Sequence, residues 1–136
     1  MSKTLIRHIT KDFWLPSILR DGVIRKEGSN FGTASAKQQF RMIGRFVWFT
    51  EIGYQSMDVR PVSFEFFAED IKAIRWTHIV RSLKKKLSRT YAQALNQSAI
   101  DIGDDPEKWW VRKHSVSISK ATRIVDASGQ EIHFDR

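Results

Sequence analysis

The chain has 136 residues and a formal net charge of +8, with 23 lysines and arginines against 15 acidic residues. This length predicts a single domain over residues 1–136, and 41% hydrophobic residues argue against disorder. No apolar run approaches the roughly 20 residues of a membrane span, so no membrane association is expected. The absence of cysteine excludes disulfides and thiolate zinc ligands and fits a cytoplasmic location. The excess of basic over acidic residues favours an anionic partner, either nucleic acid or an acidic protein.

The first elements follow from short local signals. Residues 4–9 predict a strand. A short helix follows, with Pro16 near its first turn and Gly22 placed to end it in the left-handed conformation. Residues 23–24 predict a second strand. Residues 25–44, dominated by glycine and small polar residues with basic residues interspersed, predict a long loop of the kind that often carries function.

Further strands are predicted in the middle and at the end of the chain. Residues 46–50 are apolar on both faces and predict a central, buried strand. Residues 62–66 alternate and predict a half-buried one. Neighbours on a strand face opposite ways, so Trp109 and Trp110 are expected to point to different sides. Shorter strands are predicted at 115–119 and in a C-terminal hairpin. The expected core contains Leu5, Ile18, Leu19, Val47, Phe49, Phe64, Phe66, Leu83, Leu87, Trp110 and Ile124.

Apolar residues at three- and four-residue spacing predict one long helix over residues 77–97. Residues 72–100 contain seven lysines and arginines and no acidic residue. This basic helix would contact the phosphates of a nucleic acid or an acidic partner, although most charged helix faces are simply solvated. Its basic residues are Arg81, Lys84, Lys85, Lys86 and Arg89.

Motifs for common chemistries are missing from the sequence. It contains no phosphate-binding glycine loop and no nucleophile elbow, and its four histidines lack a metal-ligand spacing, so no metal site is expected. His8 is the candidate of most interest, because it ends a strand before a helix and Thr10 adds a hydroxyl there. It would bind a ribose or an amide, or else cap the helix or pack against Trp14. A carboxylate cluster at Asp104 and Glu107 is suited to acid–base work or is a solvated loop.

The opening segment resembles a known family. Residues Arg7–Thr10, followed by Trp14–Ile24, resemble the start of ADP-ribosyltransferase-fold proteins, notably the DNA-modifying transferases of the DarT type. Small bacterial and phage proteins that share this opening also carry segments similar to Val47–Thr50 and Pro106–Val111. The resemblance implies an α+β fold, an ADP-ribosyltransferase-like split β-sandwich with a short N-terminal helix and one long basic helix.

The same resemblance implies NAD as the cofactor and assigns the site residues. His8 would hold the ribose on the nicotinamide side, and Thr10 would place the adenosine side. Trp48 or Phe49 would form an aromatic wall against nicotinamide. Arg41 or Arg45, in the long loop or at its end, would contact the pyrophosphate. The catalytic carboxylate would be Glu107, with Glu131 as the alternative.

Three functions therefore follow as expectations. The first is an NAD-dependent mono-ADP-ribosyltransferase, related to toxin or phage systems, that modifies nucleic acid or an acidic protein. The second is a non-catalytic protein on the same fold, whose basic helix binds nucleic acid or blocks a nucleic-acid-binding partner. The third is a nuclease with His8 or His78 as general base. Fold alone does not decide among them.

Overall fold

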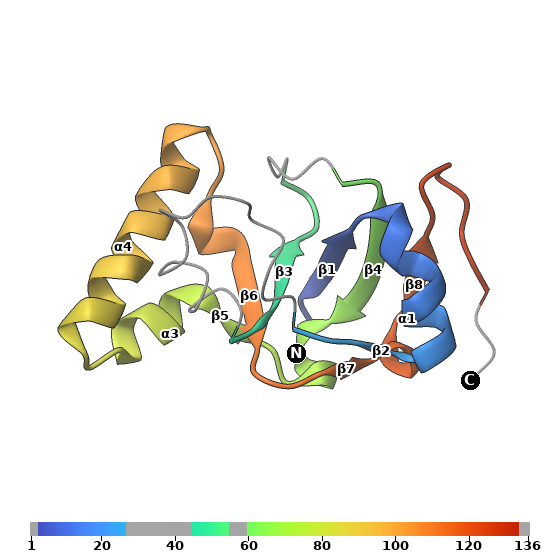
Figure 1. Ribbon diagram of the computed structural model, residues 1–136, viewed down its shortest axis with the longest axis horizontal. Helices are drawn as coiled ribbons and strands as arrows, with labels where there is room; N and C mark the ends of the chain where they lie inside the picture. Colours follow the sequence, from blue (N-terminus) through green and yellow to red (C-terminus); the bar gives the residue numbers. More distant parts are fainter. Residues whose placement is uncertain (1–2, 27–44, 55–59, 134–136) are drawn as a thin grey trace.

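The computed structural model describes residues 3–26, 45–54 and 60–133. It is a mixed α+β structure built on a six-stranded antiparallel sheet, in the order β5-β6-β3-β1-β4-β8 (Figure 1). The strands are β1 (Leu5–Thr10), β3 (Val47–Glu51), β4 (Val62–Phe67), β5 (Ile74–Arg75), β6 (Trp109–Arg112) and β8 (Arg123–Val125). A two-stranded sheet pairs β2 (Val23–Ile24) with β7 (Val116–Ser117). The predicted strands at 4–9, 46–50 and 62–66 are confirmed within a residue or two.

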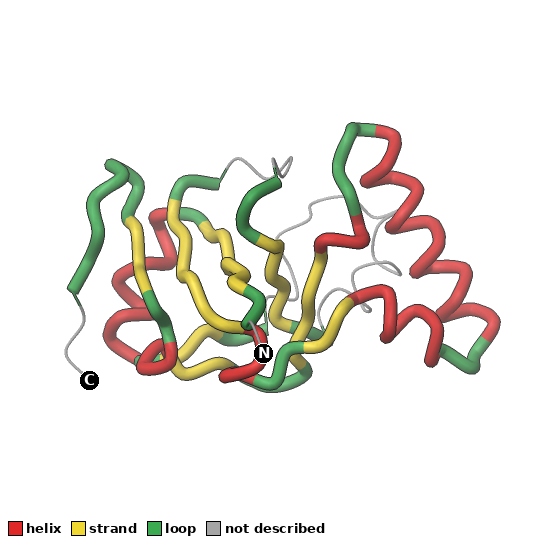
Figure 2. Tube along the Cα trace, turned by 180° about the vertical axis from the view of Figure 1, so that it is seen from behind, coloured by secondary structure: helices red, strands yellow, loops and turns green. Residues whose placement is uncertain are grey.

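The six-stranded sheet has two faces, which we name after the helices that cover them. The α1 face carries Ile6 and His8 of β1, and it packs on the small β2–β7 sheet and α1 (Leu15–Asp21). The α4 face, covered by α3 (Trp76–Ser82) and α4 (Lys86–Asp101), carries the alternate residues, among them Arg7. Figure 2 shows the strands between α1 on one side and the other two helices on the other side. The core of the α1 face includes Ile6, Val47, Phe49, Val62, Phe64, Phe66, Trp110 and Ile124.

Gly22 ends α1 in the predicted left-handed conformation, with φ of 73°. No atom lies within 4 Å of the position that a Cβ would take, so a side chain there meets backbone strain alone. We expect Gly22→Ala to lower the free energy of unfolding by about 1 kcal/mol, because L-residues other than asparagine and aspartate rarely adopt this conformation. Urea denaturation measures the loss. Gly22→Asn should be closer to wild type, and equal stability of the alanine variant would contradict the assignment.

The α4 face is covered by two helices rather than by one. The expected long basic helix is wrong, because the chain forms α3 (Trp76–Ser82) and α4 (Lys86–Asp101). The indole Nε1 of Trp76 donates a 2.7 Å hydrogen bond to Oδ1 of Asn96. In one straight helix, residues 20 positions apart would be separated by about 30 Å. The two helices therefore fold back on each other as a hairpin.

The physical reason for this break is the packing of both helices on one cluster. Trp76 and Val111 are buried there, and Ile79 and Val80 of α3 and Tyr91 and Leu95 of α4 pack against them. One straight helix could not place the side chains of both segments on this cluster. No glycine or proline marks the break between the two helices. The helical spacing of the apolar residues also continues through it, so the sequence carries no local signal for the break. The expected burial of Leu87 is also wrong, since that side chain is 61% exposed.

The remaining elements agree with the sequence prediction in outline. Trp110 lies in the core of the α1 face and Trp109 packs on the α4 face, so the expected split of the two tryptophans is confirmed. The C-terminal hairpin is reduced to a turn in which the Asp126 carboxylate accepts three hydrogen bonds, followed by a single bridge between Val125 and Glu131. In the described segments, no helix combines the length and the apolar character needed to cross a membrane.

Candidate functional site

The two central strands separate part-way along their length. β1 pairs with β4 through six residue pairs, but with β3 only through Ile6–Glu51 and Arg7–Thr50. Beyond Arg7 the side chain of His8 spans the gap, and its Nδ1 donates a 2.8 Å hydrogen bond to the carbonyl oxygen of Trp48. His8 is buried and meets Phe49 edge-on, with ring centroids 5.8 Å apart. The sheet therefore opens at its centre without exposing its core.

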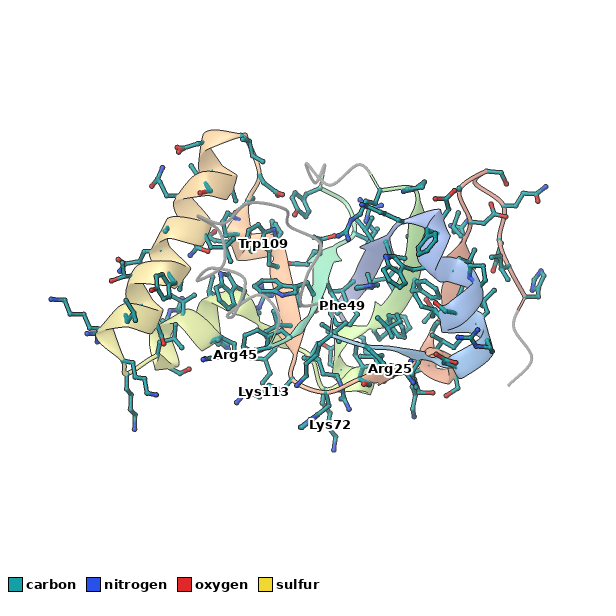
Figure 3. The ribbon with its side chains drawn as sticks, viewed as in Figure 1. Arg25, Arg45, Phe49, Lys72, Trp109 and Lys113 are labelled. Atoms are coloured by element: carbon teal, nitrogen blue, oxygen red, sulfur yellow. The ribbon has the colours of Figure 1, made fainter. Side chains whose placement is uncertain are left out.

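A cavity of about 320 Å³ lies at this opening. Its size falls within the range of small-molecule sites, about 300–1,000 Å³. One wall comes from β1 and β3, and another from the C-terminal half of α4 together with Trp109 of β6. In Figure 3, Trp109 lies on β6 toward α4, and Phe49 lies at β3. Most of the lining is apolar, which favours a ligand with a planar ring or another apolar part.

The aromatic wall is held by contacts with the hydrophobic cluster behind it. Trp48 meets Trp109 edge-to-face with ring centroids 5.8 Å apart, and its ring lies 4.8 Å from that of Trp76. Leu95 and Ile102 of the α4 side complete this part of the wall. Because Trp76 is fully buried, Trp48 has little freedom to turn away. The wall is thus a preformed surface for an aromatic ring.

Three arginines, Arg7, Arg25 and Arg60, line the same cavity. Arg25 is fixed by a 2.8 Å ion pair between its Nη1 and Oδ2 of Asp21. The hydrogen bonds from Arg25 and then from Arg20 hold the pKa of the Asp21 carboxyl below its usual value. A cavity with three arginines and an aromatic wall is suited to an anionic ligand that carries a ring.

Asp104 supplies the acidic group on the described part of the wall. Its Oδ1 accepts hydrogen bonds from the Tyr54 hydroxyl, at 2.9 Å, and from the backbone N–H of Asp105, at 2.7 Å. Its own backbone N–H donates to the carbonyl of Ala99 near the end of α4. These bonds hold the Asp104 carboxylate in position just after the C-terminal end of α4. The half-buried Asp104 therefore presents negative charge beside the aromatic wall.

The structure brings together some of the residues that the sequence singled out for NAD. His8, Trp48 and Phe49 all lie on the cavity wall. Thr10 is fully buried on the α1 face, opposite Val62 of β4, and is not on the wall. Arg45 is exposed and also off the wall. Arg41 lies outside the described residues.

The two predicted glutamates lie away from this cavity. Glu107 is exposed in the short 3-10 turn η4 (Pro106–Lys108), and its backbone N–H donates to Oδ1 of Asp105. Glu131 is exposed and lies 3.8 Å from the guanidinium of Arg123, at the opposite edge of the sheet. Asp104, three residues before Glu107, occupies the wall instead.

The predicted basic residues occupy one exposed surface at the far end of the helical hairpin, which we call the basic turn. It comprises Arg81 of α3, Lys84 and Lys85 in the connection, and Lys86 and Arg89 of α4. In the described parts of the chain, none of the five takes part in an ion pair. Breaking the helix has therefore gathered these charges at a turn rather than along a helix face.

Sequence reasoning missed Arg7 and Thr50 as lining residues, and it named Asp104 only as part of a carboxylate cluster with Glu107. Arg7 stood next to the selected His8 and Thr50 next to the selected aromatic pair, but only the strand register shows that they are opposite each other. Comparisons with protein-family models, curated proteins and solved structures find no match to this chain. The described residues contain no cluster of three or more potential metal ligands of the histidine and carboxylate types.

Proposed function

We propose that this chain is an NAD-dependent mono-ADP-ribosyltransferase with an ADP-ribosyltransferase-like fold, and that NAD binds in the cavity between β1 and β3. The observation that carries the proposal is that His8, Trp48 and Phe49 all line this one cavity. These residues come from two segments about 40 positions apart, and the sequence resemblance assigned all three to NAD. NAD contains an aromatic amide, two riboses and two phosphates, so it needs aromatic, hydrogen-bonding and cationic groups together.

The residues of the cavity fit these requirements. Trp48 offers aromatic surface to a nicotinamide ring, and the three arginines offset the charge of the phosphates. Phe49 is almost completely buried and supports His8 through their edge-on ring contact. NAD, when bound, supplies the ADP-ribosyl group that is transferred as its bond to nicotinamide breaks. Positive charge develops on the ribose during such a transfer, and a fixed carboxylate lowers the energy of that charge. We assign this role to Asp104, because its carboxylate lies in the cavity lining and is held by two hydrogen bonds.

A second function is favoured by the basic turn. Its five exposed cations, which make no ion pair with any described residue, would bind an anionic acceptor, either nucleic acid or an acidic protein, and would do so even without catalysis. In the transferase this surface would hold the acceptor. In a non-catalytic protein of the same fold it would be the functional surface itself, and it would bind nucleic acid or block a partner that does.

The first test is NAD binding, measured by quenching of tryptophan fluorescence, since Trp48 and Trp109 line the cavity. We expect saturable quenching by NAD in the wild type. His8→Ala and the more conservative His8→Gln should weaken binding by on the order of tenfold. His78→Ala, at an exposed position on α3, is the matched control and should bind like wild type.

The second half of the test is transfer of labelled ADP-ribose from NAD to DNA, RNA or proteins of a cell lysate. Label on one acceptor class, lost in the His8 variants, would support the transferase and name its acceptor. Folded wild-type protein that neither binds NAD nor transfers label would contradict it. Salt-dependent binding of DNA or RNA in that case, weakened when Lys84, Lys85 and Lys86 are changed to alanine, would favour the second function.

A further inference from the structure

A row of three side chains crosses the sheet on its α4 face at the floor of the cavity. The register pairs Trp109 of β6 with Thr50 of β3, and Thr50 with Arg7 of β1. Directly opposite residues in antiparallel strands point to the same face. The row therefore places an indole, a hydroxyl and a guanidinium side by side, and all three residues line the cavity.

Two polar atoms of this row are buried without a partner. The Nε of Arg7 and the Oγ1 of Thr50 are shielded from solvent and make no hydrogen bond in the described structure. Glu65 is the next residue of the row on β4, but its carboxylate lies 3.8 Å from Arg123 and makes no ion pair with Arg7. Buried polar groups are normally satisfied, so two adjacent exceptions on a cavity wall indicate groups that a ligand satisfies.

We propose that Arg7 and Thr50 form the phosphate subsite of this cavity. The Arg7 guanidinium and the Thr50 hydroxyl would donate hydrogen bonds to phosphate oxygens, and Trp109 would lie against the adjoining ring or sugar. This inference rests on the proposed function to the extent that the phosphate belongs to NAD. It assigns the phosphates to residues other than the predicted Arg45, which is off the wall, while the predicted Arg41 lies outside the described residues. Arg25 and Arg60, on the same wall, add positive charge without being part of the row.

The experiment compares two ligands that differ by one phosphate, nicotinamide mononucleotide and nicotinamide riboside. Titration calorimetry gives the affinity of each for wild type and for Arg7→Met, Arg7→Lys and Thr50→Val. We expect wild type to bind the mononucleotide at least tenfold more tightly than the riboside. Arg7→Met should remove this preference and leave riboside binding unchanged, because methionine keeps an apolar stem similar to that of arginine without the guanidinium donors. Arg7→Lys should keep only part of the preference for the mononucleotide, because lysine keeps the charge but not the planar set of donors.

Matched controls remove an arginine or a threonine elsewhere. Arg20→Met lowers the net charge by one at an exposed site, and Thr90→Val changes an exposed threonine of α4. Both should keep the wild-type preference. Inorganic pyrophosphate is titrated as a probe that needs no nicotinamide.

The results of these titrations test the phosphate subsite and the proposed transferase function separately. NAD binding of equal strength in wild type and Arg7→Met would overturn the subsite and leave the proposed function standing. Pyrophosphate bound by wild type and lost in Arg7→Met, with no NAD binding by either, would support the subsite and contradict the proposed function. A wild type that binds neither NAD nor pyrophosphate would overturn both.

Discussion

Replacing Trp76 by alanine should lower the free energy of unfolding by about 3–5 kcal/mol, the usual loss for a buried tryptophan. This side chain is fully buried between α3 and the sheet. Its ring contacts Phe46 and Trp48, and its Nε1 bonds to Asn96 of α4. A domain of this size has a total stability of about 5–15 kcal/mol, so the variant should lose a large part of it.

The measurement is urea denaturation followed by far-ultraviolet circular dichroism, because the substitution removes a fluorophore. Trp76→Phe keeps most of the apolar contact and loses the hydrogen bond, so about 1–3 kcal/mol is expected. Trp14→Ala is the control, since Trp14 is 37% exposed and contacts Phe13 on the surface. Its loss should be small. A Trp76→Ala protein as stable as wild type would show that the helical hairpin does not depend on this contact.

The strands were predictable because their signals are local. The alternation of residues 62–66 and the double-sided apolar run at 46–50 each reflect how one strand meets its neighbours, and both strands form where expected. The helical hairpin was not predictable in the same way. Its break at residues 83–85 has no glycine or proline, and only the shared contact of α3 and α4 with Trp76 requires it. Tertiary packing overrode a continuous helical pattern.

The candidate site was predictable in part for a related reason. His8, Trp48 and Phe49 stand in recognisable segments, so the sequence singled them out, and all three line the cavity in the structure. Arg7 and Thr50 become partners only through the antiparallel register. A sequence that gives strands but no pairing cannot show which polar residues become neighbours. The position of a carboxylate on a loop, such as Asp104 against Glu107, depends likewise on how that loop folds.

The second large effect is expected at Asp104. If the proposed transfer takes place in the cavity, Asp104→Asn should lower its rate by on the order of 10²–10³-fold, as for loss of one electrostatic group at a charge-developing centre. Asparagine keeps an oxygen that can accept from the Tyr54 hydroxyl and the Asp105 N–H, so the loop should keep its position. NAD affinity should change far less than the rate, because the charge on the ribose develops only during transfer.

Glu107→Gln is the matched comparison for Asp104→Asn, since Glu107 and Asp104 were both carboxylate candidates in one short segment. Glu107 is exposed and off the wall, so its variant should transfer at the wild-type rate if the cavity is the reaction site. The opposite result, a large loss in Glu107→Gln and none in Asp104→Asn, would assign the carboxylate to η4 and contradict the role of Asp104. Kinetics of labelled transfer at saturating NAD distinguish the two, because binding and chemistry are then separated.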